Sequence, residues 1–183
     1  MNCLSINIRG LVGGAKANWV KELRLVNKVG VIALQETKVE NVVKSGLVGF
    51  WGNKNFDFAF VASVGLSGGL ACLWDPKILK VDSVVKNRSF ILLRGSMVGS
   101  GTPINLVNIY APQSVVAKRQ LWYELSDLID PSVGQWVLVG DFNAVRSQEE
   151  RKHSKFKMVC AENFNKFIFE NGLLEFPMNG RKL

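Results

Sequence analysis

The sequence predicts a single α/β domain covering residues 1–183, with helices packed on largely antiparallel or mixed sheets. Several short segments, either apolar or alternating between apolar and polar residues, follow one another without a helix between them, which is typical of strands in such sheets. Three longer segments repeat apolar residues at helical spacing. No linker, low-complexity tract or internal repeat divides the chain. We therefore expect one layered domain with a substantial core.

The strands are predicted from apolar runs and from alternation. The segments are residues 4–8, 31–34, 57–63, 70–74, 78–85, 90–98, 104–110 and 136–139. Residues 137–139 form an apolar run bounded by turn residues, which is typical of a strand covered on both faces. Gly140 follows directly, and its lack of a side chain allows the backbone to turn or to approach another segment closely.

Helices are predicted over residues 15–28, 115–129 and 161–171. The apolar positions that define the three periodicities are Trp19, Leu23 and Val26, then Leu121, Leu125 and Leu128, then Phe164, Phe167 and Ile168. Residues 39–52 show no clear period, so we expect an irregular segment there. Phe50 and Trp51 are expected to pack this segment onto the core.

Composition and charge limit the classes of function. The chain has a formal net charge of +8, and the excess lies in residues 1–100, which carry 13 Lys and Arg against 6 Asp and Glu. Such a surface favours nucleic acid as a partner, but it also serves solubility, and the sequence leaves both explanations open. The three cysteines have no metal-ligand spacing, which predicts free thiols in a reducing compartment. Without a recognisable secretory signal or membrane span, a nuclear or cytoplasmic protein with no membrane partner is expected.

Polar side chains occur at the ends of four predicted strands. Asn7 lies in the first strand, Glu36 just after the second, and Tyr110 at the end of residues 104–110. Asp141 and Asn143 follow residues 136–139, and a spacing of two directs both side chains to one side of an extended chain. If these strands point the same way, all five side chains converge on one rim. The alternative for Asp141 is that it caps a following helix, which Asp does well.

The chemistry of this rim suits a hard cation. Carboxylates, carboxamides and a phenol are the oxygen groups that Mg²⁺, or Mn²⁺ in its place, prefers, whereas zinc favours His and Cys. Glu36 and Asn7 are the candidate metal ligands, and the metal would bind a phosphate oxygen. Asp141 is the candidate base that orients and deprotonates a water molecule. Asn143 and Tyr110 are placed to hold the phosphate.

Five motifs make the sequence resemble the endonuclease/exonuclease/phosphatase superfamily. They occur in the family's order and cover essentially the whole chain: Ser5-Ile-Asn-Ile-Arg-Gly10, Leu34-Gln-Glu-Thr-Lys38, Ser67-Gly-Gly69, Asn108-Ile-Tyr-Ala-Pro112 and Gly140-Asp-Phe-Asn143. The closest likeness is to the apurinic-type endonuclease domain of plant LINE-type (non-LTR) retrotransposons. Residues 140–146 and 149–151 carry that likeness, together with residues 164–168 and 172–173.

The resemblance implies a four-layer sandwich of two packed mixed sheets flanked by helices, and metal-dependent cleavage of phosphodiesters, with DNA as the partner. It places Asn7 and Glu36 at the metal, Tyr110 on the phosphate, Asp141 at the water and Asn143 beside it. Arg9 departs from the many DNA-repair members that carry an acidic residue there. The family also closes with a Ser-Asp-His motif after two further strands, and the sequence stops before it.

This second departure leads to two expectations and leaves alternatives open. We expect a C-terminally truncated domain with weak or no activity, because the only histidine, His153, does not match the catalytic position. We also expect an exposed sheet edge that promotes self-association. One alternative is a non-catalytic nucleic-acid-binding or vestigial fragment. Another is a different member of the superfamily, such as a phosphatase or an RNA nuclease.

Overall fold

The computed structural model describes residues 1–65, 67–150 and 156–176. They fall into two compact units, each described by itself. The first comprises Met1–Pro112 and Asp130–Asn143, and holds all the named strands and the first two helices. The second comprises Gln113–Ile129 and Ala144–Leu183, and holds the last two helices. Within the described residues, no helix combines the length and apolar character that crossing a membrane requires.

Sheet 1 has four strands in the order β1 (Asn2–Asn7), β2 (Val29–Gln35), β4 (Leu70–Trp74) and β3 (Asp57–Val61). β1 and β2 are parallel, and the helix α1 (Gly14–Val26) makes the crossover that parallel strands require. The remaining pairs are antiparallel. β2 is buried along its whole length because it lies inside the sheet, with both faces covered.

Sheet 2 has four strands in the order β5 (Leu79–Asn87), β6 (Phe90–Met97), β7 (Pro103–Tyr110) and β8 (Gln135–Asp141). β5, β6 and β7 form an antiparallel meander. β7 and β8 are parallel, and the segment between them contains the helix α3 (Val115–Leu128). The predicted fold class is confirmed, since both sheets are mixed and the described residues also form four helices.

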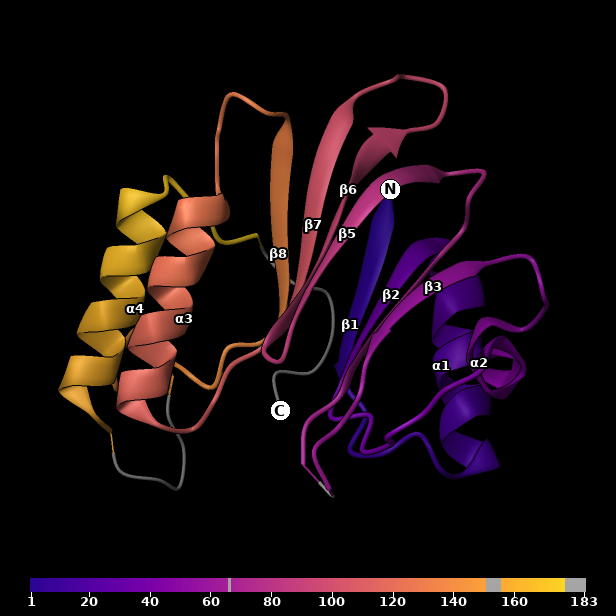
Figure 1. Cartoon of the computed structure of the whole chain (residues 1–183), viewed down its shortest axis with the longest axis horizontal. Coiled ribbons are helices and arrows are strands. Elements are labelled where there is room, and N and C mark those ends of the chain that lie inside the picture. Colours follow the sequence, from indigo (N-terminus) through magenta and orange to yellow (C-terminus); the bar gives the residue numbers. More distant parts are fainter. Residues whose placement is uncertain (66, 151–155, 177–183) are drawn as a thin grey trace. The chain divides into compact units, whose positions relative to one another are not determined.

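Two apolar layers stabilise the first unit. One lies between sheet 1 and the pair formed by α1 and α2 (Lys44–Trp51), and Figure 1 shows both helices on the same side of that sheet. The other lies between the two sheets and joins Val31 and Leu70 of sheet 1 to Ile91 and Leu106 of sheet 2. The chain's buried apolar side chains therefore hold the two sheets face to face, with the helices outside sheet 1.

A buried amide pair links the two sheets through this second layer. Gln35 Nε2 donates to Asn108 Oδ1 at 2.6 Å, and both residues are at most 1% exposed. Asn108 Nδ2 donates to the carbonyl oxygens of Leu34 and Ala71, each at 3.1 Å. Buried amides need such partners, so the pair fixes one arrangement of β7 against β2 and β4.

The expectation of an irregular segment over residues 39–52 is wrong in part, because α2 occupies its second half. Leu47, Phe50 and Trp51 are the buried residues of this helix, and their spacing of three and four puts them on one helical face. Phe50 and Trp51 do pack on the core as predicted, at 2% and 0% exposure. Burial of this face outweighs the low helix propensity of Gly46 and Gly49.

The structure shows which face of α1 is buried, and one prediction of burial, in β8, needs correction. In α1, Trp19 and Val26 are exposed, and Val20 is the buried residue that faces the core. In β8, residues 137–139 have intermediate exposure rather than the full burial expected of a strand covered on both faces. The reason is position: β8 is the last strand of its sheet and pairs only with β7 among the described strands.

The second unit is a pair of helices, α3 and α4 (Met158–Glu170). Trp122 of α3 contacts Phe164 and Phe167 of α4, with ring centroids 5.2 and 5.1 Å apart. Leu121, Leu125, Phe164 and Phe167 are buried as the periodicity predicts, whereas Leu128 and Ile168 are half-buried. Ser114 caps α3 by accepting a hydrogen bond from the Ala117 N–H at 3.5 Å.

Candidate functional site

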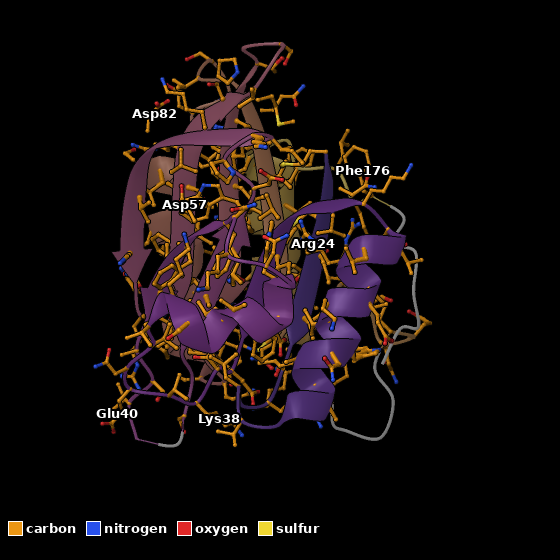
Figure 2. All side chains as sticks on the ribbon, turned by 90° about the vertical axis from the view of Figure 1, so that its right-hand side faces the viewer. Arg24, Lys38, Glu40, Asp57, Asp82 and Phe176 are labelled. Carbon is orange, nitrogen blue, oxygen red and sulfur yellow. The ribbon has the colours of Figure 1, made fainter. Side chains whose placement is uncertain are left out.

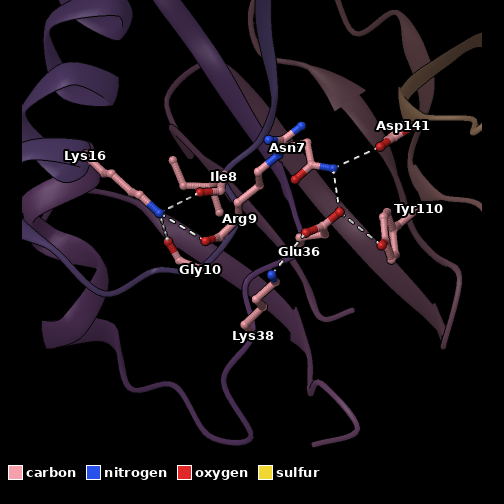
Figure 3. Close-up of polar contacts among 9 residues, drawn as sticks. All are labelled: Asn7, Ile8, Arg9, Gly10, Lys16, Glu36, Lys38, Tyr110 and Asp141. Carbon is pink, nitrogen blue, oxygen red and sulfur yellow. Dashed lines mark hydrogen bonds and ion pairs between the residues drawn. The ribbon is translucent and has the colours of Figure 1, made fainter. Parts of the chain in front are cut away.

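The predicted rim exists at one end of the first unit. Parallel pairing makes β1 and β2 end at the same edge of sheet 1, and β7 and β8 end together in sheet 2. Asn7 joins the two edges, because its Nδ2 donates to Glu36 Oε1 and to Asp141 Oδ2, both at 2.9 Å (Figure 3). Residues separated by up to 134 positions in the sequence thus meet through one side-chain amide.

Glu36 is held on both of its carboxylate oxygens. Tyr110 donates its hydroxyl to Oε1 at 3.1 Å, and the Lys38 ammonium lies 3.5 Å from Oε2. Burial by itself would raise the pKa of Glu36, but hydrogen bonds from Asn7 and Tyr110 and the charge of Lys38 outweigh it and lower the pKa. Glu36 is therefore a carboxylate at neutral pH.

Tyr110 is a hydrogen-bond donor at this site. Burial, the hydrogen bond to Glu36 and the negative charges of Glu36 and Asp141 raise the pKa of Tyr110 to about 12. Its phenol therefore stays protonated at neutral pH and can donate to a carboxylate or, equally, to a phosphate oxygen. Gly68 lies beside the ring, since a Cβ added there would be 3.9 Å from Tyr110 Cε1.

Asp141, the last residue of β8, forms a tight turn with Asn143. The Asn143 backbone N–H donates to Asp141 Oδ1 at 3.0 Å, and Asn143 Nδ2 donates to the Ala111 carbonyl oxygen at 2.7 Å. The alternative that Asp141 caps a following helix is wrong, because the next helix begins only at Met158. Asp141 instead orders the turn with one oxygen and accepts the Asn7 amide with the other.

Gly140 allows β8 to approach β7 as closely as it does. Its φ is +135°, and an added Cβ would collide with the Ile109 carbonyl oxygen. The expected close backbone approach is therefore confirmed, and its partner is β7. Only a glycine fits here, which fixes Asp141 one residue further on.

Left-handed backbone conformations gather at this edge. Among the non-glycine residues described, positive φ occurs at Lys28 and at four residues of the rim loops: Arg9 (50°), Glu36 (53°), Lys38 (54°) and Asn143 (47°). Each such residue costs about 1–3 kcal/mol and persists only where its surroundings enforce the conformation. Here the Thr37 and Lys38 N–H groups bond the carbonyl oxygens of Gly69 and Gly68 at 3.1 and 3.0 Å, so the Ser67-Gly-Gly69 motif helps to hold the Glu36 loop.

The donor set at this rim fits a hard divalent cation. Asn7 Oδ1 is buried and has no hydrogen-bond partner among the described residues, and such an unsatisfied oxygen suits a cation. The Glu36 and Asp141 carboxylates lie within hydrogen-bonding distance of the same side chain. Across the described residues, no group of three or more His, Cys, Asp and Glu is placed to hold a metal, so the amide oxygen would have to complete the set.

The sequence predicts all five rim residues but not the neighbouring polar residues that hold them and their strands in place. Gln35 and Asn108 are polar residues inside otherwise apolar strands, and that contrast was a detectable signal. Lys38 belongs to one of the family motifs, but its contact with Glu36 could not be predicted from the sequence. Figure 2 shows Lys38 with Glu40 at one end of the first unit, opposite the end that carries Asp82. His153 lies outside the described residues.

The fold and the site together define a class of protein. Its members are α/β sandwiches of two sheets, with oxygen-donor side chains gathered where parallel strands end. The model of the Endonuclease/Exonuclease/phosphatase family matches residues 4–170. The chain belongs to this family. No curated protein matches the sequence.

Solved structures agree with this fold. An AP endonuclease from Archaeoglobus fulgidus has a TM-score of 0.67 and 20% identity, over 93% of this chain and 71% of that one. The AP endonuclease LMAP from Leishmania major has a TM-score of 0.67 and 16% identity, over 92% and 66%. The Xenopus laevis APE2 catalytic domain has a TM-score of 0.69 and 14% identity, over 91% and 67%. This chain therefore spans 66–71% of the lengths of these three chains.

Proposed function

We propose that the chain is a metal-dependent phosphodiesterase of the endonuclease type, with DNA as substrate. One observation carries the proposal: the Asn7 amide bonds two carboxylates from different sheets, Glu36 and Asp141, at 2.9 Å each. This brings a candidate metal ligand and a candidate base to one place. Family membership and the fold shared with AP endonucleases support the same reaction class.

Each rim residue has a role in this proposal. Bound by Glu36 and Asn7 Oδ1, Mg²⁺ or Mn²⁺ would supply positive charge to a phosphate oxygen. Asp141 orients a water molecule and accepts its proton. Tyr110, protonated because its pKa is about 12, donates a hydrogen bond to the phosphate, and Asn143 is its companion there. Lys38 adds positive charge beside Glu36.

The activity of this chain by itself is proposed to be weak. A histidine that contacts the scissile phosphate is part of the set implied by the family resemblance, and the only histidine here is His153. Among the described residues, the rim therefore offers Tyr110, Asn143 and Lys38 as donors but no imidazole. Loss of one positioned acid or base lowers rates by about 10²–10⁴-fold.

A plasmid assay tests the reaction, because a single nick relaxes a supercoiled molecule. Purified protein with Mg²⁺ or Mn²⁺ should nick slowly, and Glu36→Gln and Asp141→Asn should each reduce nicking to the metal-free level. Glu40→Gln is the matched control, since Glu40 is an exposed carboxylate with no assigned role at this end of the unit. Nicking that survives Glu36→Gln and Asp141→Asn would defeat the proposal.

DNA binding is proposed to depend on charge rather than on sequence. The excess of Lys and Arg in residues 1–100 should make affinity fall steeply as salt rises, because bound counterions are released. Titrations at low and at physiological ionic strength measure this dependence. A flat response would assign the basic charge to solubility. Salt-dependent binding without metal-dependent nicking would instead favour the alternative of a non-catalytic nucleic-acid-binding protein.

Three further parts of the proposal concern the chain as a whole. Its origin in a LINE-type retrotransposon rests on the motif likeness around Gly140 and Phe164. One domain spanning both units is supported by the family match, which runs from residue 4 to residue 170.

Self-association is proposed because β8 has an edge that no other described strand pairs. Light scattering coupled to size-exclusion chromatography tests it, and a monodisperse monomer would argue against it.

A further inference from the structure

The loop that follows β1 gathers three backbone carbonyl groups around one side chain. Lys16 Nζ donates to the carbonyl oxygens of Ile8 and Arg9, both at 3.0 Å, and of Gly10 at 3.2 Å (Figure 3). An ammonium group has three N–H donors, so these contacts account for all of them. The cation is thus held by the segment that comes directly after Asn7.

The stability of α1 does not explain a cation at this position. Lys16 lies in the first turn of the helix, where the helix dipole disfavours positive charge. That turn has no acidic residue, and Gly13 supplies no side-chain cap. None of the ion pairs formed among the described residues involves Lys16. The three carbonyl oxygens are therefore what favours a lysine here.

The loop in turn requires a cation. Arg9 and Gly10 have φ values of 50° and 104°, which turn successive carbonyl groups toward one point. Carbonyl oxygens that face one another repel, because each carries partial negative charge. The Lys16 ammonium offsets this repulsion in the way that a bound metal ion does in a carbonyl-lined site.

Backbone hydrogen bonds connect this loop to the rim. The Gly10 N–H donates to the Glu36 carbonyl oxygen at 2.7 Å, and the Leu11 N–H donates to that of Thr37 at 3.0 Å. They extend the pairing of β1 with β2 past the ends of both strands. Glu36 is one of the left-handed residues, so these bonds help to hold it in a conformation that its own sterics disfavour.

We propose that Lys16 is a positioning residue of the site. Its ammonium is a built-in cation that fixes residues 8–11, and through them it sets Asn7 and the Glu36 backbone. The inference rests on the proposed function for the purpose of the site. The positioning itself is a property of the protein without metal or DNA, so it can be measured separately.

Amide hydrogen exchange measures it directly. In Lys16→Met, which keeps an unbranched apolar stem and loses the ammonium group, the Gly10 and Leu11 amides should exchange at least tenfold faster than in the wild type. Lys21→Met is the matched control: it removes the same charge from the same helix, and within the described part of the chain Lys21 Nζ bonds the Asn18 side chain, not the loop. Its Gly10 and Leu11 amides should keep wild-type rates. Unchanged exchange in Lys16→Met would overturn the proposal.

Rescue experiments show whether the loop is held by the charge of Lys16 or by the packing of its aliphatic chain. Lys16→Ala with added propylammonium, which replaces the missing atoms, and Lys16→Arg should each restore protection of Gly10 and Leu11, whereas sodium chloride of equal ionic strength should not. Failure of both restorations would overturn the role of the charge.

Mn²⁺ affinity, measured by proton relaxation, should fall several-fold in Lys16→Met and not in Lys21→Met. An unchanged affinity would overturn the link from the loop to the rim. A wild-type protein that binds no Mn²⁺ would defeat the proposed function instead, and the exchange result alone would then decide the role of Lys16.

Discussion

The two sheets present their site residues from different kinds of strand. In sheet 1 these residues lie at the end of a parallel pair that includes β2, a strand buried along its whole length. In sheet 2 they lie at the end of a parallel pair that includes β8, a half-buried edge strand. Each sheet therefore has one parallel pair that ends at the rim. On the sheet 1 side, Glu36 has both carboxylate oxygens engaged by Asn7, Tyr110 and Lys38. On the sheet 2 side, Asp141 accepts from its own turn with one oxygen and from Asn7 with the other, and no ion pair among the described residues joins it to a cation.

The difference shows how similar strand ends acquire different roles. The hydrogen bonds and the nearby cation lower the pKa of Glu36, which keeps its carboxylate charged and suits a metal ligand. Asp141 sits on a turn whose position depends on the close contact of Gly140 with β7. We interpret the sheet 1 half as the metal half and the sheet 2 half as the water half. Four predictions test this division, from the largest expected effect to the smallest.

The first prediction separates metal binding from catalysis. Glu36→Gln should weaken Mn²⁺ binding by about 10–100-fold or more, because a charged ligand is lost. Asp141→Asn should change the Mn²⁺ affinity by only a few-fold. In both variants the nicking rate should fall on the order of 10²–10⁴-fold, or to background. Proton relaxation and the plasmid assay measure the two quantities. Equal losses of Mn²⁺ affinity in the two variants would abolish the division into halves.

The second prediction compares Gly140, which precedes Asp141, with Gly69, whose carbonyl group bonds the loop that carries Glu36. Gly140→Ala should lower the free energy of unfolding by about 3 kcal/mol or more, because its Cβ would overlap the Ile109 backbone at a positive φ. Gly69→Ala should cost less, since its Cβ meets mainly the side-chain oxygen of Thr37. Urea denaturation measures both. Thr37→Ala should relieve part of the Gly69→Ala loss and none of the Gly140→Ala loss.

A control for that comparison is Gly46→Ala in α2, where an added Cβ meets nothing within 4 Å. It should stabilise the protein by about 0.5–1 kcal/mol, because alanine favours a helix over glycine. If Gly69→Ala proved more damaging than Gly140→Ala, the sheet 1 half would be the one defined by close backbone packing.

The third prediction concerns the phenol shared by the halves. In a Tyr123→Phe background, which leaves Tyr110 as the one tyrosine, absorbance at alkaline pH should give a pKa of about 12. A raised folded pKa stabilises the protein at lower pH, and this contribution is lost as pH rises from about 10, the ordinary value, to about 12. Adding Glu36→Gln should lower the Tyr110 pKa toward 10. A midpoint near 10 with Glu36 present would contradict the contact, provided that circular dichroism shows a folded protein.

The fourth and smallest effect is the acid dependence contributed by Glu36. Its folded pKa is lowered, so its contribution to the free energy of unfolding is full above the ordinary pKa of about 4.3 and is lost as pH falls through the folded value. The stability difference between wild type and Glu36→Gln should therefore shrink on acidification. Melting curves across this range measure it. In a Lys38→Met background the shrinkage should be smaller, because the ion pair is absent.

Local sequence patterns predicted much of the fold and the identity of the rim residues. Residues 70–74 match β4, and Asn7, Glu36, Tyr110 and Asp141 stand at strand ends as expected. Such predictions succeed because the alternation of a strand and the chemistry of a side chain are properties of adjacent residues. The sequence does not reveal α2 because Gly46 and Gly49 obscure its spacing. It does not identify the inward face of α1 either, because a helical period does not say which residue meets the core.

The sequence by itself determined which oxygen-bearing side chains are available and that they follow short strands. Only the tertiary structure decided that a single amide, Asn7, would bond carboxylates from two sheets, and that three carbonyl groups would converge on Lys16. The Lys16 contacts span six to eight positions, whereas the Asn7 contacts join residues that the chain brings together through strand order and sheet packing. Their geometry follows from pairings such as β1 with β2 and β7 with β8, which no local pattern encodes, because many strand orders bury the same apolar residues.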